Sequence, residues 1–101
     1  DEEKERLVGD LGEKKLMILR NHGTLAVGGN VSEAFTSIYF LEKACTYQVR
    51  AMAGKLELND PSDEAKETTR QQGEGSTSLA AALVWPAIRR KMEKIDPSFM
   101  N

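Results

Sequence analysis

The sequence has 101 residues, of which 40% are hydrophobic and 30% are charged, and its formal net charge is −2. This composition suits one small globular domain, and the nearly balanced charge gives no support for nucleic acid or an anionic membrane as a partner. No apolar run reaches the roughly 20 residues of a membrane span. The single cysteine, Cys45, excludes an internal disulfide and favours a reducing, cytoplasmic location.

The N-terminal half opens with a charged segment, residues 2–11, whose apolar side chains lie on one side and predict a short amphipathic helix. Two short apolar segments follow, residues 15–20 and 24–27, and we expect them to pair as antiparallel strands. The first is expected to be buried on both faces. Asn21 and Gly23 between them are residue types that favour a tight turn.

The strongest pattern in the sequence predicts a long helix over residues 30–53. Asn30 and Glu33 have the spacing of a capping box, and Gly54 is a natural residue for the C-terminal end. Residues 56–59 then form a connector. Apolar residues recur along the helix at three- and four-residue spacings and predict one buried face. The residues expected to be buried are Phe35, Ile38, Leu41, Cys45 and Val49.

The C-terminal part is predicted to contain two further helices separated by a break. Asp60-Pro61 has the pattern of an N-cap followed by a first helical residue, and the body over residues 62–72 is almost wholly polar. The glycine-containing residues 73–77 predict a flexible break. Residues 78–95 have a helical apolar pattern that contains Pro86, which is expected to kink the helix or to begin a new one.

These elements together lack a sheet that could cover their apolar faces. A two-stranded hairpin is marginal without more strands, and the long helix also needs an apolar layer against it. The sequence does not begin with methionine. We therefore expect it to be part of a longer gene product, associated with more of its own domain.

The only histidine, His22, lies between the two predicted strands. A turn histidine held by two strands presents a fixed imidazole, which is the geometry that a metal site or an acid–base site needs. A turn histidine that only bonds nearby backbone is the competing interpretation. Because the sequence has no His-x-His, no His-Glu-x-x-His and no cysteine pair, it cannot enclose a metal by itself.

Four stretches of the sequence resemble a known family. They are Arg-Asn-His-Gly at residues 20–23, Val-Gly-Gly-Asn-Val-Ser-Glu-Ala-Phe at 27–35, Leu-Glu-Lys-Ala-Cys-Thr-Tyr-Gln at 41–48, and the segment from Trp85 to Phe99. The sequence is similar to the C-terminal part of the class II (metal-dependent) aldolase/adducin domain. This resemblance implies an α/β fold: a three-layer α/β/α domain with a central, mainly antiparallel sheet. Residues 1–101 would form its C-terminal portion, with one β-hairpin and about four helices, and the N-terminal part would be missing.

The resemblance also implies an activity. Enzymes of this family are metal-dependent lyases that cleave or form a C–C bond next to a carbonyl, through a metal-stabilised enediolate. His22 matches their third imidazole ligand of a divalent metal, expected to be zinc. The other two imidazoles come from an upstream His-x-His, and the catalytic acid–base glutamate is also upstream, so this chain alone is expected to be inactive and to hold no metal. A small carbonyl substrate such as a sugar phosphate, a role in carbohydrate metabolism and a cytoplasmic homotetramer are further implications.

Two alternatives remain open on the sequence alone. The head domain of adducin shares the fold and a similar Asn-His-Gly stretch, and serves as a non-catalytic protein-interaction domain; the other alternative is a catalytically inactive paralogue. The C-terminal segment of the family's aldolases often supplies a tyrosine to a neighbouring subunit, whereas the tail here has Phe99. A basic run also precedes the tail, and it suits either a solvated helix end or attraction of an anionic substrate; it contains Arg89, Arg90, Lys91 and Lys94.

Overall fold

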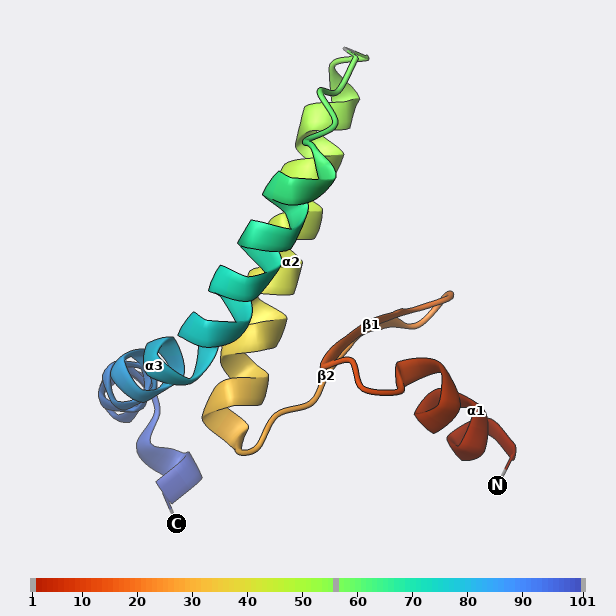
Figure 1. The fold of residues 1–101 in the computed structure, drawn as a ribbon. Coiled ribbons are helices and arrows are strands. Elements are labelled where there is room, and N and C mark those ends of the chain that lie inside the picture. Colours follow the sequence, from red (N-terminus) through yellow and green to blue (C-terminus); the bar gives the residue numbers. More distant parts are fainter. Residues whose placement is uncertain (1, 56, 101) are drawn as a thin grey trace. The chain divides into compact units, whose positions relative to one another are not determined.

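The structure, a computed structural model, describes residues 2–55 and 57–100 and divides into two units, residues 1–60 and 61–101. The first unit contains a helix, a β-hairpin and a second helix, and the second contains a long helix and a short 3-10 helix (Figure 1). In chain order the elements are α1 (Glu2–Leu11), β1 (Leu16–Leu19), β2 (Gly23–Ala26), α2 (Val31–Ala53), α3 (Asp63–Ile95) and η1 (Pro97–Met100). The expected connector at residues 56–59 falls in part outside the described residues, because Leu56 is not among them.

Helix α1 has the bounds that the sequence predicts. Its first turn carries acidic side chains, which favour the positive end of the helix dipole. The helix ends where Gly12 adopts a left-handed backbone conformation, with φ of 52°, and donates its N–H to the carbonyl oxygen of Val8 at 3.0 Å. This arrangement is the usual reason for a glycine after a helix.

The two predicted strands are present and pair in antiparallel register, with Leu16 opposite Ala26 and Ile18 opposite Thr24. The expectation that β1 is buried on both faces is wrong for this chain, because the side chain of Ile18 is 66% exposed. The physical reason is that the sheet described here has two strands and leaves part of its surface without a covering layer.

Helix α2 begins as the sequence predicts. The Oδ1 atom of Asn30 accepts the N–H of Glu33 at 3.0 Å. The Glu33 carboxylate accepts the N–H of Gly29 at 3.0 Å, one residue before the position that a standard capping box uses. At the other end Gly54 is in the right-handed helical conformation, and the left-handed residue is Lys55, with φ of 52°. The helical turn therefore continues one residue further than the glycine suggested.

The predicted apolar face of α2 forms a stripe along the helix but is not buried in this chain. Phe35 is 37% exposed and Val49 is 69% exposed, and the residues of α2 that are buried are Thr36 and Ser37. Strands β1 and β2 both contact α2. The pattern predicted the helix correctly and its burial wrongly, because burial needs a second apolar surface and the two short strands provide only a small one. The affected residues are Phe35, Ile38, Leu41, Cys45 and Val49.

Helix α3 replaces the two helices and the break that the sequence predicted. Its N-cap is Ser62, whose hydroxyl oxygen accepts the N–H of Ala65 at 3.2 Å, so the helix begins after the expected Asp60-Pro61 pair. Residues 73–77 continue the helix, and the expectation of a flexible break there is wrong.

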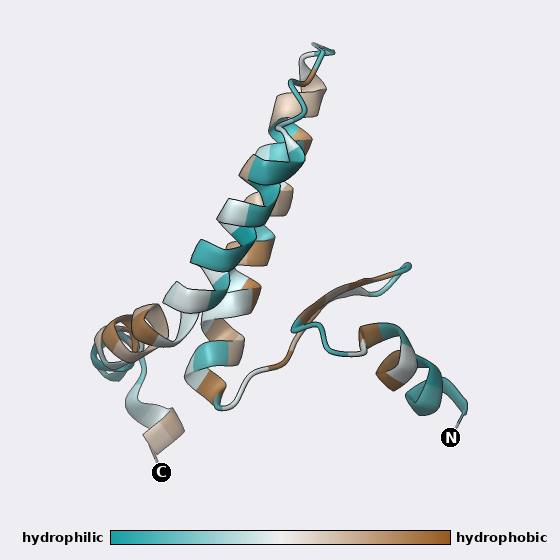
Figure 2. Cartoon of the chain, viewed as in Figure 1, coloured by the Kyte–Doolittle hydropathy of each residue, from teal (hydrophilic) through white to brown (hydrophobic). Residues whose placement is uncertain are grey.

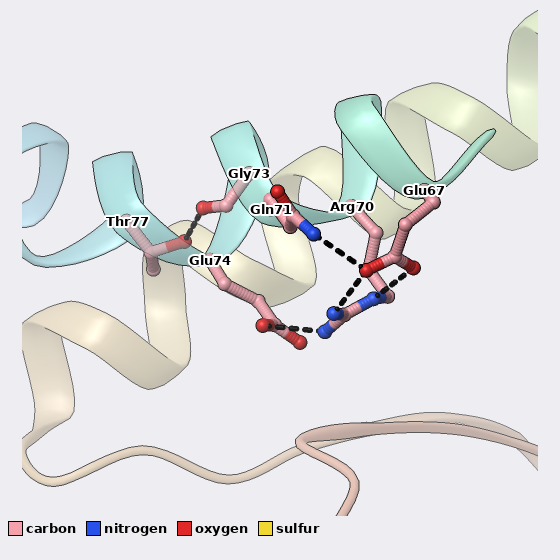
Figure 3. A network of polar contacts seen from close by, with 6 residues as sticks. All are labelled: Glu67, Arg70, Gln71, Gly73, Glu74 and Thr77. Atoms are coloured by element: carbon pink, nitrogen blue, oxygen red, sulfur yellow. Dashed lines mark hydrogen bonds and ion pairs between the residues drawn. The ribbon is translucent and has the colours of Figure 1, made fainter. Parts of the chain in front are cut away.

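Side-chain contacts across Gly73 explain why the helix continues (Figure 3). The guanidinium group of Arg70 bonds Glu67 at 2.7 and 2.8 Å and Glu74 at 2.6 Å. The hydroxyl of Thr77 donates to the carbonyl oxygen of Gly73 at 2.7 Å. Ion pairs at three- and four-residue spacing stabilise a helix locally, and the pair of Arg70 with Glu74 spans Gly73.

The two ends of α3 differ in character. Figure 2 shows its N-terminal part as almost uniformly hydrophilic and its C-terminal part with more apolar residues, as the sequence predicts. Pro86 lies inside the helix, and the blue C-terminal part in Figure 1 runs in a different direction from the teal N-terminal part. Proline removes one backbone hydrogen bond, and the helix nevertheless continues past Pro86 to Ile95.

Candidate functional site

The turn between β1 and β2 is fixed by two unusual backbone conformations. Asn21 has φ of 62°, which asparagine tolerates better than other residues with a Cβ atom. Gly23 has φ of 152°, a conformation that is essentially restricted to glycine. A Cβ atom added at Gly23 would meet nothing within 4 Å, so the backbone conformation and not a lack of space requires glycine there.

His22 lies between these two residues at the end of the hairpin, as the sequence predicts. Its backbone N–H donates to the carbonyl oxygen of Leu19 at 3.4 Å, which closes the turn. Its side chain is exposed. The imidazole is therefore carried on a defined turn and is accessible to a ligand, which is compatible with both interpretations of a turn histidine.

A metal ion would need more donors than this turn supplies. Among residues 2–55 and 57–100, no group of three or more His, Cys, Asp or Glu side chains is arranged to hold a metal ion. His22 has the right donor chemistry for zinc, but one imidazole cannot complete the four-coordinate shell that zinc prefers. The described residues thus fit one position of a metal site and cannot form that site alone.

A second side chain reaches the hairpin from α2. The hydroxyl of Thr24 donates to the Oε1 atom of Glu42 at 2.7 Å, across 18 residues of sequence. Thr24 lies two residues after His22, within β2. This hydrogen bond connects the strand that follows the turn to the middle of the long helix.

Sequence reasoning did not single out Glu42 and so missed this contact. A signal was available, because residues four apart share one face of a helix. Glu42 lies four residues after Ile38 and three before Cys45, on the stripe that is otherwise apolar. A charged residue on an apolar stripe indicates a specific partner or a functional role.

The other candidate residues lie apart from the turn in sequence. Cys45 is a free, half-buried thiol on α2.

In the second unit, the N–H of Ser98 donates to Oδ1 of Asp96 at 3.0 Å. Hydrogen bonds from the Ser98 side chain and backbone lower the pKa of that carboxyl group. Phe99, the aromatic residue of the C-terminal tail, is exposed in η1. The whole basic run is exposed near the end of α3: Arg89, Arg90, Lys91 and Lys94.

Over the part of the chain that the structure describes, no helix combines the length and the apolar character required to cross a bilayer.

Comparison with known proteins gives several similarities. Residues 1–49 match the family model described as the class II aldolase and adducin N-terminal domain, and this range contains the hairpin, His22 and Glu42. A Caulobacter vibrioides protein named "Putative aldolase class 2 protein" is 39% identical over 101 residues, which cover 99% of this chain. Rat alpha-adducin is 41% identical over 87 residues, covering 77% of this chain and 12% of adducin.

A solved structure is also similar. The crystal structure of an aldolase II superfamily protein from Pseudomonas syringae matches with a TM-score of 0.82 and 37% identity, over 94% of this chain and 39% of that protein. The mixed helical architecture with a small antiparallel sheet thus corresponds to a portion of a known fold. The chain spans 39% of the length of both the Caulobacter relative and the solved structure.

Proposed function

This chain belongs to the class II aldolase and adducin family, and from that premise we propose that it is part of a metal-dependent lyase. The intact protein would cleave or form a C–C bond next to a carbonyl group. Residues 1–101 would be the C-terminal portion of one domain. The remaining metal ligands and the catalytic acid–base would lie outside these residues.

The observation that carries this proposal is the exposed His22 imidazole on a turn of defined geometry, within the residues that match the family. His22 would be one ligand of a divalent metal, which we expect to be zinc. Bound there, such an ion would act as a Lewis acid toward a substrate carbonyl oxygen. Asn21 and Gly23 would contribute by holding the turn, because their backbone conformations fix the direction in which His22 leaves the hairpin.

The wider proposal concerns partners. The substrate would be a small carbonyl compound such as a sugar phosphate. The protein would work as a cytoplasmic homo-oligomer with four subunits. Large apolar side chains that stay exposed in this chain, such as Val49, Tyr47 and Met52, support contact with further protein.

The test is the metal content of the intact protein and of His22→Ala, measured by elemental analysis after removal of loosely bound ions. We expect one equivalent of metal per subunit in the wild-type protein and a large loss in the variant. Removing a residue that only orients a metal ligand already weakens metal binding by about 10- to 100-fold, and removing the ligand itself should weaken it at least as much. Arg20→Ala, two positions away in the same turn, is the matched control and should keep its metal. Stoichiometric metal in His22→Ala would exclude a ligand role.

A second candidate function is a non-catalytic interaction domain like that of adducin. The similarity to rat alpha-adducin over 77% of this chain favours it. An intact protein that holds no metal, cleaves no hydroxy-ketone or hydroxy-aldehyde substrate and still self-associates would support this candidate against the lyase.

A further inference from the structure

The hairpin that carries His22 needs support from outside itself. It consists of two four-residue strands, and Ile18 in β1 is 66% exposed. An isolated two-stranded hairpin is marginally stable at best. The orientation of the His22 turn therefore depends on what attaches the hairpin to the rest of its unit.

The hydrogen bond from Thr24 to Glu42 provides such an attachment. At 2.7 Å, the distance between the Thr24 hydroxyl and the Glu42 carboxylate is near the range of charge-assisted O–H to O⁻ bonds, which are stronger than neutral ones. Glu42 is well placed as an anchor because α2 begins at a capped N-terminus and runs without interruption to Ala53.

The position of Thr24 makes the bond relevant to the turn. Thr24 is paired with Ile18 in the ladder, and it is the second residue of β2, directly after Gly23. A restraint on Thr24 therefore acts next to the conformationally restricted residue that follows His22. Loss of that restraint would let the end of the hairpin move relative to α2.

We propose that Glu42 is a positioning residue, which holds the His22 turn against α2 through its hydrogen bond with Thr24. Glu42 touches neither the imidazole nor, in this proposal, a metal or substrate. The effect on the hairpin stands on the observed contact alone, whereas the consequence for metal binding rests on the proposed function.

The first test measures amide hydrogen exchange across β1 and β2 in the metal-free intact protein. Glu42→Ala and Thr24→Val each remove the hydrogen bond, and we expect exchange in the hairpin to become roughly five- to tenfold faster, the change that one net hydrogen bond supplies. Glu42→Gln and Thr24→Ser keep an acceptor and a donor and should restore most of the protection. The double variant should be no worse than either single variant, because both remove the same bond.

Thr46→Val is the matched control. The Thr46 hydroxyl lies four residues after Glu42 and bonds the Glu42 backbone carbonyl within the same helix, at 2.8 Å. This change should leave exchange in the hairpin as it is in the wild-type protein. Unchanged hairpin exchange in Glu42→Ala, or equal acceleration in Glu42→Gln, would overturn the positioning role.

The second test measures zinc affinity by titration of the same variants. We expect Glu42→Ala to weaken zinc binding by about tenfold, the low end of the loss on removing a residue that orients a metal ligand, while the protein stays folded, and Glu42→Gln to recover most of it. A variant with faster hairpin exchange but unchanged zinc affinity would overturn the link to the metal. If the wild-type protein or His22→Ala shows that no metal binds through the turn, the proposed function fails, and the exchange result still decides the positioning role.

Discussion

Each of the two units of this chain is stabilised internally by a different kind of contact. In residues 1–60, contacts between different elements determine the structure: the pairing of β1 with β2, and the bond from Thr24 in β2 to Glu42 in α2, 18 residues away. In the N-terminal part of α3, contacts between residues three or four apart do so, as in the cluster around Arg70. The structure of residues 1–60 therefore depends on single residues at particular positions. The stability of the N-terminal part of α3 is instead distributed over several neighbouring contacts.

This difference bears on where a functional side chain can be placed. His22 sits in the first unit, between two residues whose backbone conformations few other residue types adopt. The polar part of α3 contains no comparably demanding backbone conformation among its described residues. Substitutions of one residue should accordingly have larger effects near the hairpin and the start of α2 than in the polar part of α3.

The largest effect should come from Gly28→Ala, just before α2. A Cβ atom at Gly28 would lie 2.8 Å from the backbone nitrogen of Ala34 and 2.9 Å from the Cβ atom of Glu33, so the helix start must move. We expect a loss of about 1–3 kcal/mol in the free energy of unfolding, the usual cost of overpacking. Denaturant unfolding would measure it, with Gly9→Ala inside α1 as the control, which should not destabilise because a Cβ atom there meets nothing within 4 Å.

A smaller effect is expected from the two N-caps, which allow the units to be compared directly. Asn30→Ala removes an acceptor for Glu33 N–H and should cost about 1 kcal/mol. Ser62→Ala removes the acceptor for Ala65 N–H. Hydrogen exchange should show that the first variant loosens α2 and the adjoining hairpin, while the second frays only the first turn of α3. Equal loosening of the hairpin in both variants would contradict the comparison.

The sequence was sufficient for features that depend on local chemistry. The bounds of α1, the antiparallel hairpin, the cap at Asn30 and the long α2 all follow from residue type and spacing. The position of His22 in the turn does too. Burial was predicted wrongly for the stripe from Phe35 to Val49, because periodicity shows which residues share a face but not what covers it.

The remaining differences have equally specific causes. The continuation of α3 through residues 73–77 was not predicted because the glycines alone indicated a break, whereas Arg70 pairs with Glu74 across Gly73. Glu42 was missed because its partner, Thr24, is 18 residues away. The metal-ligand role of His22 stays a prediction, since the described residues contain no group of three or more donor side chains that could hold a metal ion.

A third prediction tests whether the polar part of α3 tolerates change. Gly73→Ala and Gly75→Ala should each stabilise the helix by about 0.5–1 kcal/mol, because alanine has the higher helix propensity and nothing lies within 4 Å of the added atom. Gly23→Ala should do the opposite in the hairpin, where φ is 152°. Helical content by circular dichroism and thermal unfolding would measure both. Destabilisation by Gly73→Ala would show that this glycine has a role beyond helix formation.

The smallest effect concerns pH and the Arg70 cluster. Hydrogen bonds from Arg70, and secondarily from Gln71, lower the pKa of Glu67 from its ordinary 4.5 to about 2, and hydrogen bonds to Glu67 and Glu74 raise the pKa of Arg70. A carboxyl group whose pKa is lower in the folded state stabilises that state above its unfolded pKa and loses this contribution as pH falls. Helicity around Gly73 should therefore be constant above about pH 5 and decline as pH falls from 4.5 towards 2.

The side-chain carboxyl carbon of Glu67, followed by NMR across this range, would give the pKa directly. Arg70→Met keeps an unbranched side chain and removes both ion pairs, so the Glu67 pKa should return towards 4.5 and most of the decline in helicity between pH 4.5 and 2 should disappear. High salt should also raise the Glu67 pKa in the wild-type protein, because the cluster is on the surface and salt screens exposed charges. An unchanged Glu67 pKa in Arg70→Met would mean that the cluster does not hold α3 together across Gly73, and the continuity of that helix would need another explanation.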